Sequence, residues 1–247
     1  MSELIEIPEH GLTAYRSDPT GEVRGAVIVI QEIWGLVEHI TDVADRFAAE
    51  GYVAVAPDLL GHVGLSPEAG ERLHALVTGG DEEARARAQP ELRAVMRPAR
   101  SPDFAAWAVP ALRAVVDYCL EQPGVDGAVA VVGFCFGGTY AYQLALAEPR
   151  LRAAVPFYGH FPEDGDVRSI GCPVLAFYGE QDHGITDSVP ALEERMRAAG
   201  VDFTAQVYPG AGHAFFNDTS PRYVQPAATD AWQRTLAFLD RHLGRRG

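Results

Sequence analysis

The stretch VVGFCFGG at residues 131–138 decides the fold of this chain. A run of small apolar residues ends there in Gly-x-Cys-x-Gly, and a helical pattern begins directly after it. This pattern is typical of a nucleophile elbow, a sharp strand-to-helix turn that exposes one reactive side chain, with Cys135 where serine is usual. The glycines leave room for the tight turn, and the start of the following helix would stabilise a thiolate. The stretch therefore predicts Cys135 as an exposed nucleophile.

Strands and helices alternate on both sides of this turn. Short apolar runs rich in β-branched residues predict strands at residues 25–31, 52–56, 128–132, 153–158, 173–178 and 203–208. Amphipathic spacing predicts helices at residues 37–50, 104–122, 136–147, 187–199 and 229–243. This alternation predicts an α/β fold whose central sheet is mostly parallel and is covered by helices on both faces. A chain of 247 residues with 47% hydrophobic content suits a single domain, residues 1–247.

Residues 61–103 fit this alternation least well. Several prolines and the Gly79-Gly80 pair interrupt the segment, so we expect short helical pieces. Its arginines are interspersed with acidic residues, which is typical of a solvated helix face. We therefore predict that residues 61–103 form a helical insertion, or lid, over the site.

The composition argues against several classes of partner. Asp and Glu number 34 against 20 Lys and Arg, and a net charge of −14 disfavours nucleic-acid binding. No apolar run approaches the roughly 18 residues that span a bilayer, and the acidic N-terminus lacks a signal-peptide core. Three cysteines make no disulfide framework, so we expect a reducing, cytoplasmic location and two inert core thiols, Cys119 and Cys172. Nothing in the sequence indicates an oligomeric state.

A thiol nucleophile needs a base, and a histidine and an aspartate follow two later strands. His213 lies in a glycine-rich loop directly after the predicted strand 203–208, and Asp182 follows the predicted strand 173–178. Open parallel sheets place their sites at these carboxyl ends. The histidine would move a proton and the aspartate would fix its tautomer. The chain order Cys135, Asp182, His213 is the order nucleophile, acid, histidine of α/β-hydrolases.

A glutamate follows the first predicted strand. Glu32 lies in the turn QEIWG at residues 31–35, and a carboxylate at the end of an apolar strand must be paired or exposed. In the α/β-hydrolase fold the loop after an early strand supplies one oxyanion donor, and the residue after the nucleophile supplies the other. The expected oxyanion hole is therefore the backbone N–H of Ile33 and of Phe136.

The chain resembles the dienelactone hydrolase (carboxymethylenebutenolidase) family of the α/β-hydrolase superfamily. The matching stretches are QEIWG at 31–35, GYVAVAPDL at 51–59, GFCFGG at 133–138, FYG at 157–159, GEQDH at 179–183 and GAGH at 210–213. The resemblance implies a catalytic triad of Cys135, Asp182 and His213, with Glu32 as an additional glutamate. In the family this glutamate contacts the resting thiol and moves when substrate binds, so that a thiolate forms only on occupancy.

Two positions depart from the family pattern. The family holds a substrate carboxylate with two arginines, and the position four residues after the histidine is here Asn217. The second arginine lies in the insertion near a tyrosine, whereas residues 61–103 contain arginines but no tyrosine. Dienelactone is therefore a weakly supported substrate. The predicted pocket residues are Trp34, Tyr158, Phe215 and Phe216; core packing is the alternative for the two phenylalanines.

These observations favour a hydrolase that cleaves an ester or lactone of a small molecule through a Cys-His-Asp triad and a thioester acyl-enzyme. One alternative is a simple carboxylesterase or thioesterase, and another is a non-catalytic binding protein of the same fold. No metal is expected, because the histidines lack the paired Cys or His spacing of a metal site. No cofactor is expected either, because residues 133–138 do not form a G-x-G-x-x-G run.

Overall fold

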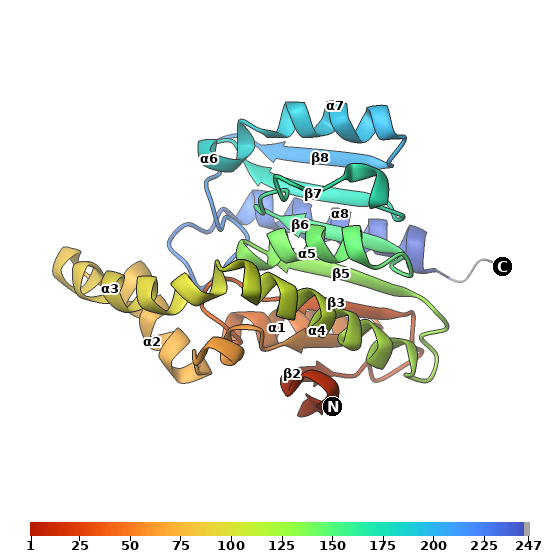
Figure 1. Cartoon of the computed structure of the whole chain (residues 1–247), viewed down its shortest axis with the longest axis horizontal. Helices are drawn as coiled ribbons and strands as arrows, with labels where there is room; N and C mark the ends of the chain where they lie inside the picture. The colour runs from red at the N-terminus through yellow and green to blue at the C-terminus, as the bar shows by residue number, and fades with distance from the viewer. Residues whose placement is uncertain (245–247) are drawn as a thin grey trace.

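A central sheet runs through the chain in the computed structural model, which describes residues 1–244 (Figure 1). Residues 245–247, which the predicted domain included, lie outside the described residues. The described residues form eight strands in the spatial order β1-β2-β4-β3-β5-β6-β7-β8. The strands are β1 (Ser2–Ile7), β2 (Leu12–Ser17), β3 (Ala26–Ile30), β4 (Val53–Pro57), β5 (Val129–Phe134), β6 (Ala153–Phe157), β7 (Val174–Gly179) and β8 (Phe203–Tyr208).

The sheet is mostly parallel, as the alternation of strands and helices predicts. Strands β3 to β8 pair in parallel, while β1 pairs antiparallel with β2 and β2 pairs antiparallel with β4. Every residue of β3, β4, β5, β6 and β7 is buried. A strand covered on both faces reads as a continuous apolar run, which is why the sequence reveals these five. The hairpin of β1 and β2 was not predicted.

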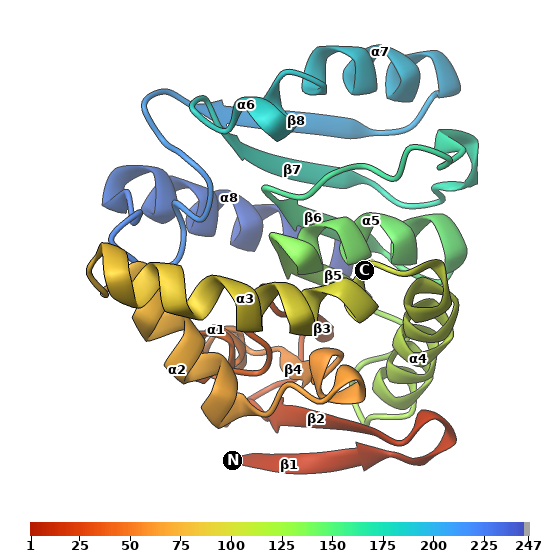
Figure 2. The same ribbon diagram turned by 60° about the vertical axis from the view of Figure 1, so that its left-hand side comes forward.

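Helices cover both faces of the sheet (Figure 2). On one face lie α1 (Glu38–Ala49) and α8 (Gln225–Leu243), and on the other lie α4 (Pro102–Leu120) and α5 (Phe136–Ala147). Helix α7 (Val189–Ala199) packs against β8 at the edge of the sheet, and the short α6 (His183–Thr186) precedes it. Helix α5 and strand β8 have the predicted bounds, and the other predicted elements differ by a few residues at their ends.

The segment 61–103 is helical, but it is less fragmented than predicted. After a 3₁₀ turn at Leu60–Val63 it forms α2 (Pro67–Thr78) and α3 (Glu82–Ala99), and α3 continues through Pro90. A proline removes one hydrogen bond from a helix interior. Two features stabilise α3 despite this loss. The Asp81 side chain caps its first turn, and one stripe of the helix is buried: Ala88, Leu92, Met96 and Ala99.

The site lies where the order of the strands reverses. Strand β3 is flanked by β4 on one side and by β5 on the other, so successive strands diverge from this point and leave a crevice at their carboxyl ends. Ile30 pairs with Gly133, so the loop that carries Glu32 leaves the sheet beside the turn at Cys135. Helices α2 and α3 project beyond this end of the sheet, towards which the arrows of β7 and β8 point in Figure 1.

Candidate active site

Cys135 occupies a strained turn between β5 and α5. Its backbone angles are φ 55° and ψ −111°, a combination that residues with a side chain rarely adopt. The turn depends on glycines at close approaches: a Cβ atom at Gly133 would overlap the carbonyl oxygen of Gly137, and one at Gly137 would overlap that of Ile30. The N–H of Gly137 donates to Gln31 O at 3.0 Å and fastens the turn to the loop after β3. The predicted strand-turn-helix geometry is therefore present.

The structure brings Cys135, His213 and Asp182 together in one chain of contacts. The Cys135 Sγ lies 2.9 Å from His213 Nε2, and His213 Nδ1 lies 2.6 Å from Asp182 Oδ2. Each residue follows a different parallel strand, β5, β8 or β7, so the shared carboxyl end of the sheet gathers them. The side chains of His213 and Asp182 are only 27% and 15% exposed. The imidazole therefore lies between a sulfur and a carboxylate with little water around it.

The surroundings of His213 favour its charged form. Burial lowers the pKa of the imidazole. The hydrogen bonds to Asp182 and to Cys135, together with their charges, outweigh this effect and raise the pKa to about 10. At neutral pH both ring nitrogens of His213 therefore carry a proton, and the side chain is an imidazolium. An imidazolium in this position can give its proton to the leaving group of a substrate that the sulfur attacks.

Two residues that line the cavity with Cys135 have a backbone N–H without an acceptor among residues 1–244. Phe136 is the first residue of α5, so its N–H has no acceptor within the helix. Within residues 1–244 the N–H of Ile33 donates to no acceptor either. Both residues line the same cavity as Cys135. These are the two residues that the sequence predicts as oxyanion donors.

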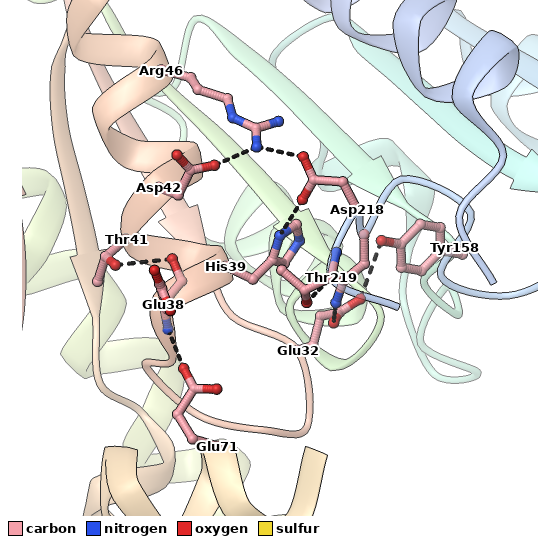
Figure 3. A network of polar contacts seen from close by, with 11 residues as sticks. Glu32, Glu38, His39, Thr41, Asp42, Arg46, Glu71, Tyr158, Asp218 and Thr219 are labelled. Carbon is pink, nitrogen blue, oxygen red and sulfur yellow. Dashed lines mark hydrogen bonds and ion pairs between the residues drawn. The ribbon is translucent and has the colours of Figure 1, made fainter. Parts of the chain in front are cut away.

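Glu32 is buried and is held by two donors (Figure 3). The residue as a whole is 2% exposed. Tyr158 Oη donates to its Oε1 at 3.2 Å, and Asn217 Nδ2 donates to its Oε2 at 2.7 Å. The Asn217 amide is itself oriented, because its oxygen accepts from the N–H and the hydroxyl of Thr219. The partner of the Cys135 sulfur is His213. The glutamate thus differs from the resting arrangement that the family resemblance implies, in which it contacts the thiol.

The loop that carries His213 and Asn217 is fastened to helix α1. Asp218 lies 2.5 Å from Arg46 and 3.5 Å from the buried ring of His39, and Arg46 also pairs with Asp42 (Figure 3). The His39 ring, and then the Arg46 guanidinium, hold the pKa of the Asp218 carboxyl well below its usual range. Because Asp218 follows Asn217 directly, this ion pair holds the amide that binds Glu32.

Backbone strain concentrates around this site. Of the four described residues other than glycine with positive φ, three are Cys135, Tyr158 and Ala214. Each lines a cavity beside the sulfur. Such conformations cost about 1–3 kcal/mol each and gather at functional sites.

Two cavities open on either side of Cys135, and both are lined by Ile33, Cys135 and His213. The larger has a volume of about 1110 Å³ and the smaller about 390 Å³. Segment 61–103 contributes residues to both cavities. The smaller cavity takes Arg85 and also Arg222, a residue that the sequence analysis missed because nothing in its local pattern marks it.

The structure places two of the four predicted pocket residues at the cavities and the other two in the core. Trp34 lines the smaller cavity and Tyr158 the larger. Phe215 and Phe216 line neither; they are 0% and 3% exposed and pack in an aromatic cluster with Phe157. Core packing, the alternative, is therefore correct for these rings, because the loop turns them inward onto the sheet.

The other two thiols are buried in the core, as expected. Cys119 is 0% exposed and Cys172 is 4% exposed, and burial raises the pKa of each to about 12. Among residues 1–244 there is no cluster of three or more histidine, cysteine or acidic residues that could hold a metal ion. In the same part of the chain no helix combines the length and apolarity needed to cross a bilayer.

Comparison with known proteins places this geometry among hydrolases. The sequence model described as "Dienelactone hydrolase family" matches residues 12–243. A Salmonella typhimurium protein named "Putative carboxymethylenebutenolidase" is 32% identical, over 99% of this chain and 88% of its own length. A Saccharolobus solfataricus protein of the same name is 34% identical, over 87% of this chain and 89% of its own.

A solved structure agrees over nearly the whole length. The "Putative Dienelactone Hydrolase" from Klebsiella pneumoniae superposes with a TM-score of 0.82 at 30% identity and covers 98% of each chain. The chain therefore has the α/β-hydrolase fold, with its central sheet and the helices on both faces.

Proposed function

Because the chain belongs to the dienelactone hydrolase family and is therefore an ester hydrolase, we propose that it cleaves an ester or lactone by nucleophilic attack of Cys135. The proposed substrate is a small molecule, and the proposed activity is carboxymethylenebutenolidase-like. The contact chain from the Cys135 sulfur through His213 to Asp182 is the single observation that carries this proposal, with 2.9 Å and 2.6 Å between the joined atoms. We further propose a cytoplasmic enzyme, since its cysteines are free thiols.

In the first half of the reaction, the sulfur of Cys135 attacks the carbonyl carbon of the ester. The sulfur gives its proton to His213, whose raised pKa favours the imidazolium, and Asp182 stabilises that cation. The carbonyl oxygen gains negative charge and accepts from the N–H groups of Ile33 and Phe136. The C–O bond then breaks, His213 gives its proton to the leaving alkoxide, and a thioester remains on Cys135.

In the second half, water replaces the alcohol. His213, now neutral, takes a proton from the attacking water, and the oxygen bonds to the thioester carbonyl carbon. The C–S bond breaks, the acid product leaves, and the sulfur and the imidazolium are restored. With a lactone, the alcohol released in the first half remains attached to the acyl group. Both halves therefore use the same three side chains. His213 gives a proton to the alcohol in the first half and takes one from water in the second.

Glu32 is proposed to act in this mechanism as a fixed neighbour of the nucleophile. Its two carboxylate oxygens are held by Tyr158 and Asn217, and Asn217 stands where the family resemblance implies an arginine. We propose that the Cys135–His213 pair is formed before substrate binds, and that Glu32 helps to set the shape of the smaller cavity that it lines.

The direct test is replacement of the nucleophile. We expect Cys135→Ala to abolish hydrolysis of a small activated ester, about 10⁴-fold or more in kcat, with an unchanged circular dichroism spectrum. The matched control is Cys172→Ala, which removes a thiol remote from the site and retains activity. Intact-protein mass spectrometry of quenched wild-type reactions should find one acyl group, and peptide mapping should place it on Cys135. Turnover retained by Cys135→Ala would refute the mechanism.

A further inference from the structure

The larger cavity beside Cys135 is far bigger than a small lactone requires. Its volume is about 1110 Å³, whereas a cavity of about 150 Å³ is enough to hold a benzene-sized ring. Cavities of about 300–1,000 Å³ take drug-sized ligands. Cys135, His213, Ile33 and Phe136 all line it, so whatever occupies it is in reach of the groups proposed to react. The unused volume therefore belongs to a part of the substrate beyond its ester group.

Two helices form the long walls of this cavity. Helix α4 contributes Pro102, Ala105 and Val109, which are spaced i, i+3, i+7 and so share one face. Helix α5 contributes Thr139, Gln143 and Leu146, which are spaced i, i+4, i+7 and also share one face. The two helices pack side by side on the same face of the sheet (Figure 2). Seven residues of helix rise by about 10 Å, so the walls enclose an elongated groove rather than a round pocket.

The lining of this groove is mostly apolar, and its carboxylates and its arginine lie where it meets solvent. Met96, Ala99 and Tyr140 are buried, whereas the lining residues Arg100, Asp164 and Asp166 are exposed. Asp166 is in addition paired with Arg168. Apolar surface of this kind gains free energy when a hydrocarbon displaces its water. Among residues 1–244, Arg100 at the solvent edge is the one lysine or arginine that lines this groove.

From this geometry we propose that the groove between α4 and α5 binds an elongated apolar acyl or alkyl group of the ester. The preferred substrates are thus esters with a medium-length to long hydrocarbon group. This inference rests on the proposed function, because the groove is joined to the reacting groups only through Cys135 and its neighbours. The residues of α4 and α5 that line the groove are not members of the triad, and they would select the substrate by the length of its hydrocarbon group.

The inference is tested with two substrate series. One is p-nitrophenyl esters from acetate to octanoate, and the other is acetate esters of alcohols from ethanol to octanol. We expect kcat/KM to rise in one of the series by about twofold per methylene, which amounts to tens of fold across it. The rise reflects transfer of methylenes from water into a groove that remains partly open.

Ala105 and its neighbour Ala106 provide a matched pair of variants. Ala105 lines the groove, whereas Ala106 is the next residue of the same helix and is exposed to solvent. Ala105→Trp fills the groove and should lower the ratio of kcat/KM for the longest to the shortest ester by at least about tenfold. Ala106→Trp should leave the ratio unchanged. Gln143→Trp fills the groove from the opposite wall and should act like Ala105→Trp, so the test does not depend on the folding of one variant.

The outcomes separate this inference from the proposed function. A chain-length preference that Ala105→Trp or Gln143→Trp abolishes, while Ala106→Trp keeps it, supports the groove. Hydrolysis of acetates with flat series of both kinds overturns the groove and leaves the proposed function intact, as does a preference that both filling variants retain. Absence of turnover for every ester overturns the proposed function itself.

Discussion

The two cavities that meet at Cys135 differ in both size and chemistry. The smaller, of about 390 Å³, is lined by polar and charged side chains, Glu32, His74, Arg85 and Arg222 among them. The larger, of about 1110 Å³, lies beside α4 and α5 and is mostly apolar. Only the reacting groups belong to both. The two cavities therefore share the residues proposed to react, whereas the smaller one adds two arginines and the larger one a long apolar wall.

The insertion is what makes the two sides different. The end of α2 and the start of α3 supply His74 and Arg85 to the smaller cavity, and the end of α3 supplies Met96 and Ala99 to the larger. These helices lie beyond the carboxyl ends of the strands (Figure 1). A change of sequence within 61–103 can therefore alter specificity on either side without touching the residues that react.

The largest expected effect is one that both sides share. His213→Ala should lower kcat by about 10³–10⁴-fold for an anionic ester and for a long neutral ester alike, because the imidazole lines both cavities and contacts the sulfur. Steady-state kinetics on the two substrates measure it, with His10→Ala as a remote control. A loss confined to one substrate would mean that the cavities do not share one set of reacting groups.

The second expected effect is a shift of the pH profile. Above about pH 10 the His213 imidazolium loses its proton and can no longer protonate a leaving alkoxide, so kcat/KM for an alkyl ester should fall there. Asp182→Asn removes a charge and weakens a hydrogen bond that raise the pKa of His213, so the alkaline limb should move to lower pH. The shift should be the same for anionic and neutral alkyl esters. An alkaline limb that Asp182→Asn leaves in place would contradict the assignment.

The third expected effect concerns the polar wall of the smaller cavity. Asn217→Ala removes the 2.7 Å hydrogen bond to Glu32 and leaves that buried carboxylate with Tyr158 as its remaining donor. Loss of a partner to a buried charged group costs about 1–3 kcal/mol. We expect the free energy of unfolding in urea to fall by that amount. An unchanged stability would mean that water replaces the amide and that the wall is not held by Asn217.

Much of the fold could be predicted from the sequence because its signals are local. The buried strands β3 to β7 read as apolar runs, and the elbow at Cys135 needs its glycines within a few residues. The hairpin of β1 and β2 gave no such signal, since all but one residue of β1 is at least partly exposed at the edge of the sheet. A strand with so little burial carries no clear pattern.

The site was predictable only as far as strand ends indicate it. Cys135, Asp182 and His213 each follow a recognisable strand, so their meeting could be anticipated from topology. The amide of Asn217 that binds Glu32, and the approach of Arg222 to the smaller cavity, depend on how one long loop folds back. No periodicity encodes such a path, and the same loop turned Phe215 into the core.

The smallest expected effect separates the two cavities most cleanly. Arg222→Ala removes one exposed cation of the smaller cavity and should lower kcat/KM about tenfold for an ester that carries a carboxylate, with little change for a neutral ester of the same length. Because the cation is exposed, the difference should shrink in high salt. Arg97→Ala, which removes a cation of the insertion that lines neither cavity, is the control. An equal loss for charged and neutral esters would show that Arg222 supports the loop of His213 rather than the recognition of charge.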